Sequence, residues 1–218
     1  MHQHIWAVSA AETFTNGGRA VVYCVGDRAK PRALAAFAES ISASGRTLRL
    51  LGAEETGESA PIAYTDDAAL ASLACSLRAS GAALRLAHYP SEDAFVAALG
   101  SAYRGRGALA LRPVPWRASP RITLDASWTS PDEKLSSGRR SDLRRMRRAA
   151  EKEGAVGIEF LAPGAADVGG PLEEALAVES AGWKARAGTS ILKNNAAERF
   201  FRAYALRAAR AGILRIAL

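Results

Sequence analysis

The sequence predicts an α/β (α+β) protein in which helices flank mixed sheets. Apolar segments of strand length alternate with longer segments of helical periodicity. Glycines and prolines separate most of these segments. Of the 218 residues, 49% are hydrophobic and 23% are charged, which is ordinary for a globular protein of one large or two small domains. Alternating strands and helices are typical of folds in which helices cover a sheet.

The first half is predicted to begin with a strand at 19–27 that ends at a Gly-Asp turn. Pro31 fits the first turn of a helix, and Leu34, Phe37 and Ile41 then share one face, so we predict a helix over 31–43. Two more helices are expected at 65–80, capped by Thr65 or Asp66, and at 91–102. The remaining predicted strands lie at 46–52, 62–64, 83–89, 107–114 and 119–126.

The second half is predicted to begin with a helical turn at Ser130 and Pro131, followed by a strongly basic helix. A strand at 155–162, a helix at 171–183, an irregular segment at 184–194 and a helix at 195–212 then follow in order. A last strand begins at Ile213. Because the chain stops within this apolar strand, we expect it to be a fragment whose last domain is incomplete.

Composition limits the classes of function. The net charge of +7 favours anionic partners. The two cysteines, Cys24 and Cys75, stand in apolar segments without a CxxC or Cys/His spacing, so we expect buried free thiols and no metal site. The N-terminus lacks the basic start and apolar core of a signal peptide, and no apolar run of about 18 residues predicts a membrane span. The simplest expectation is a cytoplasmic location.

The basic helix carries much of the positive charge. Between Arg139 and Glu153, seven cations stand against three acids. A helical wheel places Leu143, Met146, Ala149 and Ala150 on one side and most of the cations on the other. Three interpretations remain open: a solvated helix docked by Leu143 and Met146, a site for an anionic small ligand, or a nucleic-acid contact. The lack of aromatic residues in 136–154 argues against DNA binding.

Motifs in residues 130–218 resemble a known family. The pattern S-x-R-R-x-x-L-R-R-x-x-R is followed by a strand, a helix ending in Gly-Trp-Lys, a Gly-Thr pair and a helix with Phe-Phe-x-x-Tyr. This order resembles the acetyltransferase-like domain of bacterial proteins of cellulose or exopolysaccharide biosynthesis. Those proteins belong to the GNAT superfamily and are similar to the Fem peptidoglycan aminoacyl transferases, which carry two GNAT-like domains. The matching positions are Ser137, Arg140, Leu143, Arg144, Arg147, Glu179, Trp183, Lys184, Gly188, Thr189, Phe200 and Tyr204.

The resemblance implies two tandem GNAT-like domains, a degenerate one at 1–129 and the start of a second at 130–218. It implies transfer of an acyl group from acetyl-CoA or another acyl-CoA to a small-molecule amine or sugar-amine acceptor. We expect no metal and no DNA partner. The alternatives are a Fem-like transferase that uses charged tRNA and a non-catalytic accessory protein of polysaccharide biosynthesis. As a fragment, the chain is expected to be inactive alone.

Candidate site residues follow from the resemblance, each with an alternative. Glu179 is a general base or the ion-pair partner of Lys184. Trp183 is a wall of the acceptor pocket or a core aromatic. Lys184 and Arg186 hold an anionic acceptor or lie in solvent, and the basic helix contributes Arg140, Arg144 and Arg147 to anion binding.

Two further features of the sequence bear on ligand binding. Glu54, Glu58 and Asp66 lie in loops at strand ends, where ligands often bind, but their spacing predicts no catalytic pair. A GNAT pyrophosphate loop has the pattern Arg/Gln-x-x-Gly-x-Gly/Ala and opens a helix. Its one literal match, 78-RASGAA-83, is predicted to be a helix C-cap before a strand. The cofactor-binding residues are therefore unknown from the sequence.

Overall fold

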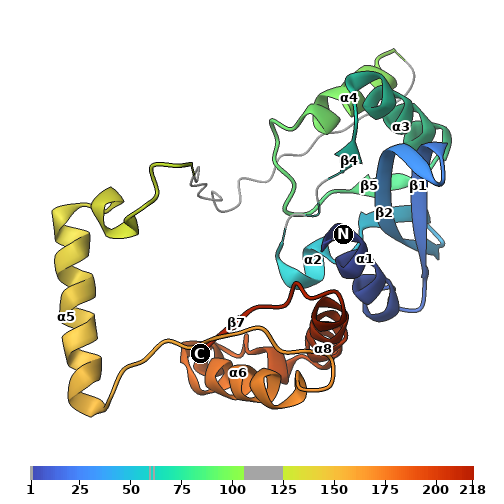
Figure 1. Cartoon of the computed structure of the whole chain (residues 1–218). Coiled ribbons are helices and arrows are strands. Elements are labelled where there is room, and N and C mark those ends of the chain that lie inside the picture. The colour runs from blue at the N-terminus through green and yellow to red at the C-terminus, as the bar shows by residue number, and fades with distance from the viewer. Residues whose placement is uncertain (1, 59, 61, 106–124) are drawn as a thin grey trace. The chain divides into compact units, whose positions relative to one another are not determined.

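The computed structural model describes residues 2–58, 60, 62–105 and 125–218 (Figure 1). The chain divides into two compact units, and each is described by itself. The first comprises Met1–Val114 and Ala162–Ile216, and the second Pro115–Leu161 and Ala217–Leu218. The predicted strand at 107–114 and all but the end of that at 119–126 lie outside the described residues.

A five-stranded mixed sheet forms the centre of the first unit. Its order is β1 (Arg19–Asp27), β2 (Lys30–Ser42), β3 (Gly45–Leu50) and β5 (Ala83–Arg85), with β4 (Ala63–Tyr64) also paired to β2. The β1–β2, β2–β3 and β2–β4 pairs are antiparallel, whereas β3 and β5 are parallel. Gly18 precedes β1 against the backbone of β2, where a Cβ atom would lie 2.0 Å from the carbonyl oxygen of Glu39. Only glycine fits this approach without a shift of the backbone.

The predicted helix over 31–43 is wrong, because this segment is the long strand β2. Asp27 and Lys30 close a tight hairpin, in which the Asp27 carboxylate accepts the N–H of Ala29 at 2.7 Å. Burial follows a period of two, with Ala33, Ala35 and Phe37 inside, while Ile41 is 77% exposed. The segment is rich in alanine, so its few large apolar residues fit a helical period as well as a strand period.

One face of the sheet packs against α3 (Asp67–Ala79) and α4 (Ala94–Tyr103). The predicted helices at 65–80 and 91–102 are thereby confirmed, as is the capping of α3 by Asp66, whose carboxylate accepts the Ala69 N–H at 2.9 Å. The predicted stripe of α3 is buried beneath the sheet residues Phe37 and Leu48: Leu70, Leu73, Ala74 and Leu77.

The other face of the sheet contributes Ala38 to a second core with α1 (His2–Thr13) and α8 (Asn195–Arg210). Phe200 of α8 is fully buried there, and its ring centroid lies 4.6 Å from Trp6 and 5.0 Å from Phe14. The unit is therefore a sheet with helices on both sides. Residues 2–13 had not been predicted as a helix.

The remaining elements of this unit are short or lie near α8. They are α2 (Ala53–Thr56), α6 (Gly169–Ala181), α7 (Trp183–Ala187) and η2 (Ile191–Lys193). Val168, just before α6, shares a small core with Ala205 and Ala209 of α8. The predicted helix at 171–183 is confirmed with a start two residues earlier, and part of the segment predicted as irregular is the helix α7. Both cysteines are free, as predicted, but exposed rather than buried.

The second unit contains η1 (Pro131–Lys134) and the basic helix α5 (Ser137–Glu153). Ser136 caps α5 by accepting the N–H of Arg139 at 3.2 Å. No residue of α5 is buried, and Leu143 and Met146 are 38% and 59% exposed, so this unit does not dock the helix through them. The short strands β6 (Phe160–Leu161) and β7 (Ile216–Ala217) pair, and Glu159 and Leu218 exchange two backbone hydrogen bonds beside them.

The predicted fold class is confirmed, because helices and mixed sheets build the chain. The division into GNAT-like domains at 1–129 and 130–218 stays a prediction. The compact units have other bounds, since α6 and α8 belong to the same unit as the large sheet.

Candidate functional site

Glu179 lies near the end of α6 and joins three neighbouring elements. One carboxylate oxygen accepts the backbone N–H of Ile191 at 3.1 Å, and the other lies 3.3 Å from Nζ of Lys184. Burial opposes ionisation of this carboxyl group. The Ile191 N–H, the buried Ser190 hydroxyl and the Lys184 ammonium together outweigh burial and hold its pKa below the usual range. Glu179 is therefore an ionised anchor between α6, α7 and η2, with the ion pair that the sequence offered as one alternative.

The predicted ligand-binding residues on the short helix α7 differ in whether their side chains have a partner. Lys184 is tied to Glu179, whereas Trp183 is 65% exposed and Arg186 is exposed without a hydrogen-bond or ion-pair partner among the described residues. The interpretation of Trp183 as a core aromatic is wrong. At positions i and i+3 of one helix, Trp183 and Arg186 are neighbours on one face.

The arginines predicted on α5 belong to the other unit and also differ in their contacts. Arg140 donates to the carbonyl oxygen of Leu135 at 2.5 Å, and Arg147 pairs with Glu151 at 2.8 Å, one helical turn away. Arg144 has no partner among the described residues. These arginines belong to one unit and Trp183 belongs to the other, so each group of residues is described by itself.

The acidic loop residues of the first half are mostly used in ion pairs. Glu54 contacts Arg49 at 3.4 Å and also pairs with Arg85. Asp66 caps α3 and accepts from Thr65 and Arg32, and these hydrogen bonds lower its pKa to about 2. Glu58 is exposed in the loop. The structure thus gives structural roles to Glu54 and Asp66 and forms no catalytic pair from the three.

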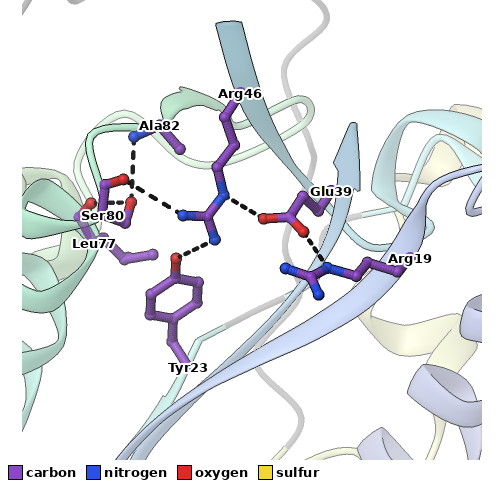
Figure 2. Close-up of polar contacts among 7 residues, drawn as sticks. All are labelled: Arg19, Tyr23, Glu39, Arg46, Leu77, Ser80 and Ala82. Carbon is purple, nitrogen blue, oxygen red and sulfur yellow. Dashed lines mark hydrogen bonds and ion pairs between the residues drawn. The ribbon is translucent and has the colours of Figure 1, made fainter. Parts of the chain in front are cut away.

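A buried carboxylate that the sequence analysis did not single out lies in the centre of the sheet. Figure 2 shows Glu39 of β2 between the guanidinium groups of Arg19 and Arg46, one on each carboxylate oxygen. Arg46 also donates to the hydroxyl of Tyr23 at 3.2 Å and to the carbonyl oxygen of Ser80 at 3.4 Å.

The hydrogen bond from Arg19 lowers the pKa of Glu39, and the bond to Glu39 raises the pKa of Arg46. One carboxylate faces two guanidinium groups, so the cluster keeps a net positive charge, and it joins three strands to the end of α3. The signal in the sequence was one acid within the apolar run 34–41.

The segment 78–83 does not fit a pyrophosphate. It begins in the last turn of α3, has Gly81 in the left-handed region at φ 68°, and ends at the first residue of β5. Carbonyl groups at the end of a helix repel an anion, so the interpretation as a C-cap is confirmed. A depression of about 360 Å³ lies elsewhere, between α1 and α8, and includes Ile5, Val8, Arg207 and Arg210 but no predicted site residue.

Across the described ranges, no group of three or more His, Cys, Asp or Glu side chains is placed to hold a metal ion. Within those same ranges, no helix is both long enough and apolar enough to cross a membrane.

Comparison with known proteins gives one finding. No curated protein and no solved structure matches the chain. A family model, described as the acetyltransferase (GNAT) domain, matches residues 137–218. The match begins at the first residue of α5 and includes α6, α7 and α8. Residues 137–218 are therefore similar to a GNAT-type acetyltransferase domain, a family whose members transfer acyl groups.

Proposed function

We propose that the protein is an N-acyltransferase that moves an acyl group from acyl-CoA to an amine acceptor. The match of residues 137–218 to the acetyltransferase (GNAT) domain carries this proposal. The motif resemblance to proteins of cellulose and exopolysaccharide biosynthesis supports an amino sugar as the acceptor and a role in cell-envelope or polysaccharide synthesis.

In this reaction the neutral nitrogen of the amine attacks the thioester carbonyl. The new C–N bond forms, the C–S bond breaks, the amine loses a proton, and the sulfur leaves as the thiol. A general base for this step works best with a pKa near the operating pH. The lowered pKa of Glu179 and its contacts with the Ile191 N–H and the Lys184 ammonium favour a positioning role, in which it holds α7 in place, over proton abstraction.

The test uses the complete gene product with acetyl-CoA and a panel of amines that includes glucosamine, and it measures release of the free thiol. We expect one amine class to raise thiol release above the rate without amine. The Trp183→Ala variant should raise KM for that amine, and Ile41→Ala, a matched change at an exposed residue of β2, should not. Thiol release that no amine increases would refute the proposal.

A second candidate, transfer from charged tRNA, is favoured by one observation on α5. Arg144, Arg148 and Lys152 stand at i, i+4 and i+8 and have no partner among the described residues, so they form a row of free cations. Three phosphate contacts would give a slope of roughly 2 to 3 in log affinity against log salt. Replacing all three cations by glutamate should abolish tRNA binding, whereas Arg28→Glu should not. If tRNA binding has no such slope, the second candidate is excluded.

A further inference from the structure

The segment around α7 contains three cations, and two of them have structural tasks. Lys184 pairs with Glu179, and Nζ of Lys193 donates to the carbonyl oxygen of Ala185 at 2.9 Å. The carbonyl oxygen of Lys184 also accepts the N–H of Thr189 at 2.9 Å, which closes the end of the helix. Arg186 is the one of these three cations whose charged group has no partner among the described residues.

Trp183 is the neighbour of Arg186 on the same helical face, and 65% of it is exposed. Tryptophan is highly buried on average, so a largely exposed indole leaves apolar area in water without a folding benefit. Arg186 is exposed as well. A ligand therefore has access to both side chains.

The support beneath these two side chains is fixed. The two contacts of Glu179 tie α6 to α7 and to η2, and the Lys193 contact ties η2 back to α7. Because the helix is held in place, its backbone needs no ordering on binding, which favours affinity. The pair thus offers one flat apolar surface and one planar cation about a helical turn apart.

We propose that Trp183 and Arg186 form a binding site for a ring that carries a phosphate or carboxylate group. One face of the ring, the flat face of a base or the C–H face of a sugar, packs on the indole, and the anion accepts paired hydrogen bonds from the guanidinium group. This inference rests on the proposed function, because two of its substrates have this chemistry: the nucleotide end of CoA and an acidic amino sugar. Both ligands would contact the same two side chains, so the experiment has to distinguish one ligand from the other.

Calorimetric titration of the complete gene product tests the site without turnover. The probes are adenosine 3′,5′-bisphosphate, glucosamine 6-phosphate, adenosine and inorganic phosphate. We expect one of the two ring phosphates to bind at least about tenfold more tightly than either adenosine or phosphate alone, because only a joined ligand uses both side chains. If adenosine 3′,5′-bisphosphate binds more tightly, the site belongs to CoA. If glucosamine 6-phosphate binds more tightly, the site belongs to the amine acceptor.

Two variants connect the binding to these residues. Trp183→Ala and Arg186→Gln should each weaken the preferred ring phosphate by about tenfold. Only Arg186→Gln should also weaken inorganic phosphate. The matched controls are Ile41→Ala and Arg28→Gln, at exposed positions of the same unit, and they should leave both affinities unchanged.

Failure of the inference and failure of the proposed function are distinct. If no ring phosphate binds, or if binding is equally strong in Trp183→Ala and Arg186→Gln, the inference is overturned even when the protein transfers acyl groups. If the ring phosphate binds as expected but no amine raises thiol release, the site stands and the proposed function falls. If Arg28→Gln weakens ring-phosphate binding as much as Arg186→Gln does, the effect comes from the net charge of the protein, and the proposed site is overturned.

Discussion

Replacing Phe200 by alanine tests whether α8 and α1 share one core. The Phe200 ring is fully buried and contacts four further aromatic residues, with centroid distances of 4.6 Å to Trp6, 5.0 Å to Phe14, 5.2 Å to Phe201 and 6.0 Å to Tyr204. The substitution removes a phenyl ring from a packed site and leaves a cavity among large, rigid side chains. A buried Phe→Ala change costs about 3–5 kcal/mol, and loss of the edge-to-face contact with Trp6 favours the upper part of this range.

The assay is urea unfolding followed by circular dichroism, with a thermal melt beside it. For a chain of this size, 1 kcal/mol corresponds to about 2–4 °C, so the melting temperature should fall by roughly 6–20 °C. Ile41→Ala is the control, because Ile41 is 77% exposed and should cost less than about 0.5 kcal/mol. A cost below about 1 kcal/mol for Phe200→Ala would refute the packing of α8 on α1.

Two further predictions concern carboxylates. The pKa of Asp66 is about 2 in the folded chain, against 3.8 for an unperturbed aspartate, so its stabilisation is complete above about pH 4 and is lost as the pH falls towards 2. Urea midpoints measured across this range should fall more steeply for the wild type than for Asp66→Asn, and parallel curves would contradict the lowered pKa of Asp66. Glu179→Gln keeps an oxygen for the Ile191 N–H but loses the charge pair with a partly exposed Lys184, so it should cost less than about 1 kcal/mol. Its thiol-release rate should stay within about tenfold of the wild type, whereas a loss above about 100-fold would make Glu179 the general base.

Local signals in the sequence were sufficient for elements with strong periodicity. The apolar stripe of α3 and its Asp66 cap are both found in the structure, because side-chain spacing and capping are properties of neighbouring residues. The long strand β2 was predicted as a helix for a physical reason. The buried residues Ala33 and Ala35 follow the strand period of two. Alanine is small and favours helices, so this period does not stand out in the sequence. Here, pairing with β1 and β3 overrides local preference.

The candidate site was predictable in its residues but not in their roles. The spacing of Glu179 and Lys184 pointed to their ion pair, which the structure contains. Exposure of Trp183 depends on what packs around α7, and neighbours distant in sequence decide this. The Glu39 cluster shows the same limit, since Arg19 and Arg46 reach the carboxylate only after three strands have paired.

Partner contacts sort the predicted ligand-binding residues into two groups that substitutions should affect differently. In one group the charged side chain already makes an ion pair or a hydrogen bond within the protein: Lys184, Arg140 and Arg147. The other group has no partner among the described residues: Trp183, Arg186 and Arg144.

Substitution of a tied cation leaves an acceptor unpaired, so its first effect is on the stability of the local structure. Substitution of a free residue leaves the fold intact, so any effect on binding or transfer reports a contact with the ligand itself. The distinction makes Trp183 and Arg186 the informative positions on α7, and Arg144 the informative position on α5.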